Sequence, residues 1–242
     1  MAEISSPSRS ILSLLSVHIH IGQHHILQGV TFDVEAGRST VLLGRNGAGK
    51  SSTLRAIIGL NPVTSGVIKF SGETIQGLKP FEISRLGIGF TPEDQGVFFS
   101  LTVEENFRLS LFEETEQTRR NLETVFELFP DLKKFWRTKA GLLSGGQKQM
   151  LGIARAFVND HKVLLIDEPS KGLAPIVVEH LGHSLNKIKD KTTVVLVEQN
   201  FYLASQVGVD YFIFDNGRVV HKGQMKDLVD DQVLKKKYLG IG

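Results

Sequence analysis

The chain is expected to be an α/β protein with a mostly parallel core sheet, and three observations predict this class. An apolar run leads into a glycine-rich loop and a helix pattern, a second apolar run ends in two carboxylates, and strands alternate with helices after residue 163. Continuous apolar runs such as residues 163–166 are typical of parallel strands, because helices cover both faces of such sheets.

The first elements after a serine-rich tail, residues 1–10, are expected to be strands. Residues 11–35 alternate apolar and polar side chains, which is the pattern of half-buried strands. The histidines of this stretch invite a metal site, but neither cysteine nor carboxylate accompanies them, and they alternate with apolar neighbours. The solvated polar face of an ordinary strand is the preferred interpretation of His18, His20, His24 and His25.

The sequence GRNGAGKS at residues 44–51 fits the phosphate-binding loop (P-loop) template GxxxxGK[ST]. The apolar residues 40–43 predict a strand before the loop, and helical spacing over residues 54–58 predicts a helix that stops at Gly59. Glycines here let backbone amides surround a phosphate chain beside the positive end of the helix dipole. The expected nucleotide-binding residues are Gly44, Arg45, Asn46, Gly47, Ala48, Gly49, Lys50, Ser51 and Ser52.

Specific side chains can be assigned expected roles in binding ATP and Mg²⁺. Lys50 would reach the β- and γ-phosphates, and the Ser51 hydroxyl would be a ligand of Mg²⁺. The string VLLIDE at residues 163–168 predicts the other half of the site, because ligands of parallel sheets bind at the carboxyl ends of the strands. Asp167 is expected to contact Mg²⁺, and Glu168 is expected to polarise the attacking water.

The remaining elements follow in order along the chain. Residues 81–95 are expected to lead into a mobile loop, and Thr102 with Glu105 forms a capping-box pattern at the start of a helix. A second amphipathic helix is predicted over residues 122–129. Asp-Asn-Gly at residues 215–217 predicts a hairpin after the last core strand.

With LSGGQ at residues 143–147, the chain resembles the ATP-binding cassette (ABC) ATPases from about Ile11 onward. The resemblance implies a P-loop NTPase ABC cassette, in which residues 11–242 form a single ATPase domain. An antiparallel β subdomain and a helical subdomain, at about residues 101–150, would belong to it. It also implies that the signature binds the γ-phosphate held by the P-loop of a second subunit. The signature residues concerned are Ser144, Gly145, Gly146 and Gln147.

DEPSKGLAP, VEQN and LKKKYLG resemble the F-type ATPase subunits of branched-chain amino-acid importers, and of importers for related small solutes such as urea. Those subunits usually have DEPSLGLAP. Lys171 is therefore a departure that places a charge in the stretch that normally lines the dimer contact.

Three positions differ from the general ABC pattern. Gln199 stands where most cassettes have a histidine that contacts the γ-phosphate, and Glu93 stands where a glutamine senses Mg²⁺, although Gln95 is close enough to be an alternative. Ile21 stands where an aromatic residue stacks on adenine, with His20 as a substitute. The resemblance makes Ile21 and Glu93 part of the nucleotide site and Glu93 a metal-site residue. The predicted catalytic residues are Glu168, Gln199 and Lys50.

Composition excludes several classes of partner and location. The formal net charge of +2 is too small to indicate nucleic acid, and no apolar stretch approaches the roughly 18 residues of a membrane-spanning helix. The absence of cysteine excludes a disulfide scaffold. Together with the resemblance, this predicts a cytoplasmic protein bound peripherally to the cytoplasmic face of the cell membrane.

The expected function is ATP hydrolysis that powers a membrane importer. The resemblance implies membrane-spanning permease subunits, a second ABC ATPase subunit, identical or related, and indirectly a periplasmic or extracellular solute-binding protein. The alternatives are a urea-type importer, a soluble ABC ATPase that acts as an assembly factor, and a non-hydrolysing module, which the motif residues disfavour. Phe98 and Phe99 are expected either to dock a coupling helix of the permease or to be buried in the helical subdomain.

Overall fold

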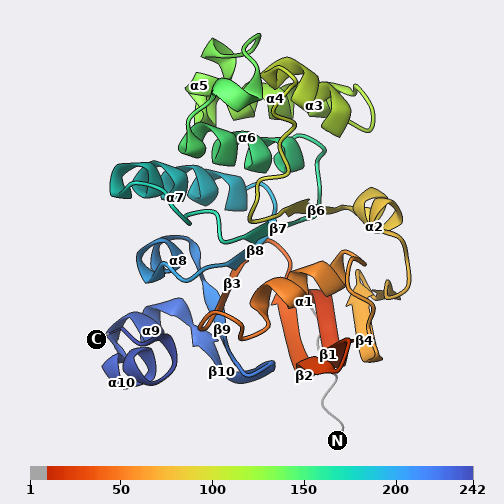
Figure 1. Ribbon diagram of the computed structural model, residues 1–242, viewed down its shortest axis with the longest axis vertical. Helices are drawn as coiled ribbons and strands as arrows, with labels where there is room; N and C mark the ends of the chain where they lie inside the picture. The colour runs from red at the N-terminus through yellow and green to blue at the C-terminus, as the bar shows by residue number, and fades with distance from the viewer. Residues whose placement is uncertain (1–9, 242) are drawn as a thin grey trace, which may run out of the picture.

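The structure is a computed structural model that describes residues 10–241, and it contains two β-sheets with helices packed around them (Figure 1). The smaller sheet is antiparallel and has the strand order β2-β1-β4-β5. Its strands are β1 (Ser10–Ile21), β2 (His24–Glu35), β4 (Ser65–Phe70) and β5 (Glu73–Thr74). The predicted tail lies outside the described residues except for Ser10, which begins β1.

The alternating pattern of β1 is confirmed, and so is the solvated polar face, because His20, His24 and His25 are exposed and His18 is half-buried. Val17 and Ile19 are fully buried, whereas His18 and His20 lie on the other face of the strand. His18 Nδ1 and His25 Nε2 are hydrogen-bonded at 3.0 Å, and the rings of His20 and His25 stack with their centroids 4.1 Å apart. The imidazoles of His18, His20 and His25 therefore contact one another on this solvated face.

The larger sheet is the core of the molecule, and it confirms the predicted fold class. Its strand order is β10-β9-β3-β8-β7-β6, with all neighbours parallel except β10 and β9. Every residue of β3, β7 and β8 is buried, as expected for strands covered on both faces. The strands are β3 (Ser39–Leu43), β6 (Ile88–Thr91), β7 (Val163–Asp167), β8 (Thr193–Val197), β9 (Asp210–Asp215) and β10 (Arg218–Gln224).

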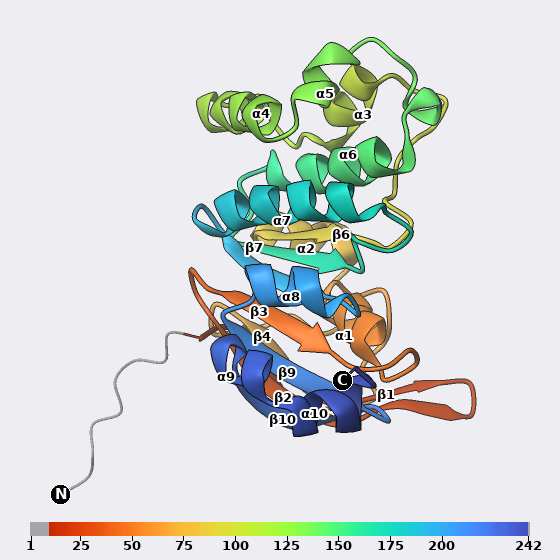
Figure 2. The same cartoon turned by 90° about the vertical axis from the view of Figure 1, so that its left-hand side faces the viewer.

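The helices form a group at one end of the molecule and cover the faces of the core sheet (Figure 2). The end group is α3 (Val103–Ser110), α4 (Glu116–Leu128) and α5 (Pro130–Lys134), and Thr102 and Glu105 cap α3 as predicted. No helix within residues 10–241 is both long and apolar enough to cross a membrane. The other helices are α1 (Lys50–Ile57), α2 (Pro80–Leu86), η1 (Ala140–Leu142), α6 (Gly145–Phe157), α7 (Pro175–Lys189), α8 (Phe201–Val207), α9 (Met225–Asp230), α10 (Gln232–Leu234) and η2 (Lys235–Leu239).

The predicted path from residue 81 toward a loop contains two elements that the sequence pattern did not identify, α2 and β6, and the loop begins after Thr91. Pro80 is the first residue of α2, and the Glu82 carboxylate accepts a hydrogen bond from the Lys79 amide at 2.7 Å. β6 then adds to the edge of the core sheet beside β7. Ile88 is buried there, so tertiary packing supplies the stability that the short local pattern lacks.

The strands β3, β7, β8 and β9 each contribute to two hydrophobic cores, because their side chains alternate between the faces of the sheet. In β3, Val41 and Leu43 pack in the core on the side of α6, α7 and α8, whereas Leu42 packs in the core shared with the antiparallel sheet. The sheet is thus held from both sides. The loops that follow β3, β7 and β8 consequently begin from fixed positions at one edge.

Candidate nucleotide site

Three loops meet at the carboxyl ends of β3, β8 and β7, which are neighbours in that order. The P-loop follows β3, Glu168 follows β7, and residues 198–200 follow β8. Ligands of parallel sheets bind at this edge of the strands. The topology therefore gathers residues that are more than a hundred positions apart in the sequence.

The path of the P-loop requires glycine at its two ends. Gly44 has φ of 142°, and a Cβ there would lie 2.3 Å from the carbonyl oxygen of Phe214. Gly49 has φ of 104°, and its Cβ would lie 2.7 Å from the side chain of Leu27. A larger residue at either position would combine an unfavourable backbone conformation with a steric overlap. The glycines therefore set how closely the loop lies against β2 and β9.

Lys50 is the first residue of α1, and its side chain is buried against the P-loop. Its Nζ donates to the carbonyls of Gly44 at 2.8 Å and Arg45 at 3.0 Å, and it lies 3.8 Å from a carboxylate oxygen of Glu168. Burial lowers the pKa of Lys50, while Glu168, Asp167 and Glu198 act in the opposite direction. A phosphate chain would offer this ammonium a stronger, charged partner than the two carbonyls do.

Ser51 and Asp167 form a pair of oxygen ligands that fits Mg²⁺. The Ser51 hydroxyl donates to Asp167 Oδ1 at 2.9 Å, whereas the buried Oδ2 finds no hydrogen-bond partner within residues 10–241. Burial raises the pKa of Asp167 to about 6. Mg²⁺ prefers oxygen ligands such as a hydroxyl and a carboxylate. The unpartnered Oδ2 of Asp167 has free lone pairs, so a bound cation would supply the partner that it lacks.

Glu168 and Gln199, two of the predicted catalytic residues, are in direct contact. Glu168 has φ of 43°, a conformation that residues other than glycine rarely adopt, and it turns the chain sharply after β7. Gln199 Nε2 donates to Glu168 Oε1 at 2.6 Å and also to Asn46 Oδ1 of the P-loop. The amide that replaces the usual histidine therefore bridges the loop that would bind phosphate and the carboxylate that would act on water.

Glu198 is a buried residue of the site to which the sequence analysis assigned no role. Its carboxylate accepts four hydrogen bonds, from Ser170 N and Oγ, both at 2.9 Å, from Gln199 N at 3.1 Å and from Asn200 N at 3.0 Å. Burial raises its pKa, and the four hydrogen bonds oppose that shift. A carboxylate directly after the buried run TVVLV was the available signal. Glu198 ties the loop after β8 to the stretch after β7.

Other predicted residues lie outside this cluster. Ile21 is exposed at the end of β1, and alternation places His20 on the opposite face of the strand, where its ring stacks on that of His25. The role of His20 as a substitute for Ile21 stays a prediction. Glu93 forms an ion pair with Lys171. The adenine and metal roles of Ile21 and Glu93 stay predictions.

The signature residues form the exposed start of α6. Ser144 Oγ accepts from the amide of Gln147 at 3.3 Å, and the Gln147 side chain accepts from Ser144 N at 2.9 Å, which makes a capping box. Gly145 is exposed beside them. In both views α6 is separated from α1 by α7 and the core sheet (Figure 1, Figure 2), so the signature does not reach the P-loop of its own chain.

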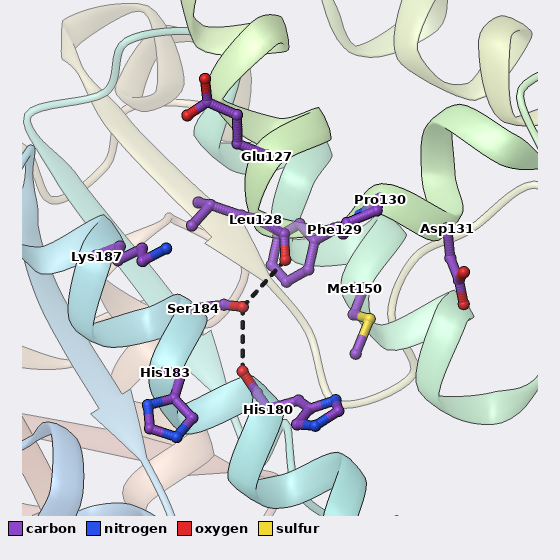
Figure 3. A pocket seen from close by; sticks show the side chains of 10 residues that line it. All are labelled: Glu127, Leu128, Phe129, Pro130, Asp131, Met150, His180, His183, Ser184 and Lys187. Atoms are coloured by element: carbon purple, nitrogen blue, oxygen red, sulfur yellow. Dashed lines mark hydrogen bonds between the residues drawn. The ribbon is translucent and has the colours of Figure 1, made fainter.

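A cavity of about 470 Å³ between α4, α5, α6 and α7 is separate from this site (Figure 3). It is mostly apolar around Phe129, and Ser184 Oγ donates there to the carbonyls of Leu128 at 3.4 Å and His180 at 3.1 Å. The rings of His180 and His183 point in different directions. None of the lining residues belongs to the P-loop, so this cavity is not the phosphate site.

Comparisons with known proteins agree with this geometry. Residues 27–171 match the family described as ABC transporter. The chain is 37% identical over 232 residues to the high-affinity branched-chain amino acid transport ATP-binding protein BraG of Pseudomonas aeruginosa, which spans 95% of this chain and 100% of that protein. It is 36% identical over 220 residues to the probable branched-chain amino acid transport ATP-binding protein LivF of Archaeoglobus fulgidus, spanning 90% and 93%. The ADP conformation of MJ1267, an ATP-binding cassette of an ABC transporter, has a similar fold, with a TM-score of 0.82, 24% identity and coverage of 96% and 99%.

Replacing the Glu168 carboxylate by an amide should separate binding from turnover. We expect Glu168→Gln to bind ATP nearly as well as the wild type, because Lys50, Ser51 and Asp167 are unchanged. Its turnover should fall by about 100-fold or more, because the amide cannot accept a proton from water. Fluorescent-nucleotide titration and phosphate release measure the two properties. Glu123→Gln, an exposed change in α4, is the control, and a Glu168→Gln variant with wild-type turnover would contradict the role.

The buried Asp167 should make the metal-free protein less stable as the pH rises. Its pKa is about 6 in the folded chain and about 3.9 in the unfolded chain, so between pH 4 and pH 7 ionisation costs the folded state more. Relative to the wild type, Asp167→Asn should therefore gain stability with increasing pH, by up to about 3 kcal/mol. Urea unfolding in EDTA at pH 4 to 7 measures the difference. A constant difference across this range would show that Asp167 titrates normally.

Proposed function

The chain belongs to the ABC transporter family, and we propose that it is the ATP-hydrolysing subunit of an importer for branched-chain amino acids. One observation carries the proposal: Lys50, Ser51, Asp167, Glu168 and Gln199 converge at one edge of the core sheet. The likeness to BraG over that protein's whole length supports the choice of solute. An importer for a related small solute such as urea is the second candidate, favoured by the same family strings at residues 167–175.

The chemistry follows from groups that are already in place. Backbone amides of the P-loop and the Lys50 ammonium bind the phosphates, and the low local dielectric strengthens these contacts. Ser51 and Asp167 would hold Mg²⁺, which when bound neutralises charge on the phosphate oxygens. Glu168 accepts the proton of the attacking water, and Gln199 orients the carboxylate through its hydrogen bond.

A second ATPase chain would complete each site. Ser144 and Gly145 present a small, exposed helix N-terminus, which is suited to an anion, but α6 is remote from the P-loop of the same chain. A head-to-tail arrangement of two chains would place the signature of each on the γ-phosphate of the other. The start of α6 is free for such a contact, because Ser144 and Gly145 are exposed in the single chain.

Membrane-spanning permease subunits are the proposed partners at the cytoplasmic face of the membrane, with a solute-binding protein acting on their other side. Phe98 and Phe99 follow the loop after β6, and they are 49% and 55% exposed. The alternative that both are buried in the helical subdomain is therefore wrong. Arg155 lies over the ring of Phe98 at 5.2 Å and Lys148 over that of Phe99 at 5.4 Å, which fixes two aromatic anchors on one surface.

Two damaged chains should restore one intact site when they are mixed. We expect Lys50→Ala and Ser144→Arg each to be nearly inactive alone. An equal mixture should recover roughly a quarter of the wild-type rate, because half of the dimers are mixed and each has one of two sites intact. Phosphate release at several mixing ratios tests this. A mixture without activity, with a wild-type rate per chain independent of dilution, would contradict self-association.

Loss of the gene should abolish high-affinity uptake of leucine and leave urea uptake unchanged. Expression of the wild-type chain should restore uptake, whereas Phe98→Ser with Phe99→Ser should restore less than about a tenth, because aromatic anchors carry much of an interface energy. Radiolabelled solutes measure uptake. Phe81→Ser removes an equally exposed aromatic residue from α2 and should behave as the wild type. Intact leucine uptake in the deletion strain would contradict the proposed solute.

A further inference from the structure

Lys171, which departs from the family string, ties two loops of the site together. Its Nζ donates to Glu93 Oε1 at 2.5 Å, and the side chains are 63% and 38% exposed. Glu93 lies in the loop after β6, and Lys171 lies three residues after Glu168. The contact therefore joins Glu93, the residue expected to sense Mg²⁺, to the segment that follows Glu168, the predicted catalytic carboxylate.

The loop that carries Glu93 is also held from its other side by α6. Gln95 has φ of 66°, and a Cβ on Gly152 would lie 2.8 Å from the Gln95 carbonyl oxygen. Arg155 of the same helix donates to the carbonyl of Gly96. Glu93 thus belongs to a short segment that contacts α6 at one end and Lys171 at the other.

The charges around Lys171 are those of the proposed magnesium site. The hydrogen bond and charge of Glu93 raise the pKa of Lys171, and Glu168 and Asp167 contribute in the same direction. Glu93 leaves the sheet at the same edge as Asp167, because Thr91 at the end of β6 pairs with Ile166 of β7 in a parallel register. The Lys171 ammonium is therefore bound to a carboxylate at the edge of the sheet that also holds the Ser51–Asp167 pair.

We infer that Lys171 is a positioning residue for the magnesium site, because it holds the Glu93 carboxylate and competes with the metal ion for it. The inference rests on the proposal that Ser51 and Asp167 bind Mg²⁺. Glu93 can turn to a metal only when its contact with Lys171 opens. Leucine at position 171, the usual family residue, leaves the carboxylate free, so this chain should bind Mg²⁺ more weakly than a chain with leucine there.

The size of the effect should be modest, because both partners are partly exposed and solvent screens their attraction. We expect Lys171→Leu to tighten metal binding by about two- to fivefold, in proportion to the strength of a surface ion pair. Lys171→Arg retains the pair and should leave the affinity near the wild-type value. Lys222→Leu, which removes an exposed lysine from β10, should have no effect.

The experiment measures Mn²⁺ binding to the full chain with ADP, by the loss of the free Mn²⁺ signal in electron paramagnetic resonance. The decisive comparison is Lys171→Leu in the wild type and in a Glu93→Gln background. The inference is supported if Lys171→Leu tightens Mn²⁺ binding in the wild type but by less than about 1.5-fold in the Glu93→Gln background, where the charge that Lys171 pairs with has been removed. Equal tightening in both backgrounds, or none in the wild type, overturns it. A wild-type chain that binds ADP without Mn²⁺ dependence contradicts the magnesium proposal itself.

Discussion

Burial of opposite charges at one edge of the core sheet is the constraint on which the rest of the site depends. Lys50 and Asp167 are almost inaccessible to water. Glu168 contacts both Lys50 and Gln199, which lies in the loop after β8. Isolated charges in such a place are costly, so each needs a partner at a defined distance. The glycines of the P-loop and the unusual backbone of Glu168 serve this need, because they bring carbonyls and carboxylates to the ammonium.

The loops after β7 and β8 act as one unit because of Glu198. Its four hydrogen bonds hold Ser170 on one side and Gln199 with Asn200 on the other. Gln199 then supports Glu168 with an amide, which cannot take up a proton as an imidazole can. Of this hydrogen-bonded pair only the Glu168 carboxylate can accept a proton, which agrees with the catalytic role proposed for it.

The separation of α6 from the P-loop is the structural reason for proposing that a second chain completes the site. The exposed start of α6 carries donors for an anion, while the other end of the same helix grips the segment that bears Glu93. Phe98 and Phe99 follow that segment on the surface. The aromatic pair, the segment that bears Glu93 and α6 are consequently connected through a few adjacent residues.

The strand, loop and helix around Lys50, the buried strand before Asp167 and the hairpin at residues 215–217 could be predicted from the sequence, because glycine positions and continuous apolar runs leave few local alternatives. The elements α2 and β6 could not, because their short patterns depend on packing beside β7. The partners of Glu198, Gln199 and Lys171 became evident in the folded chain alone. Those contacts join loops distant in the chain, and they arise from the order β3-β8-β7, which no local pattern encodes.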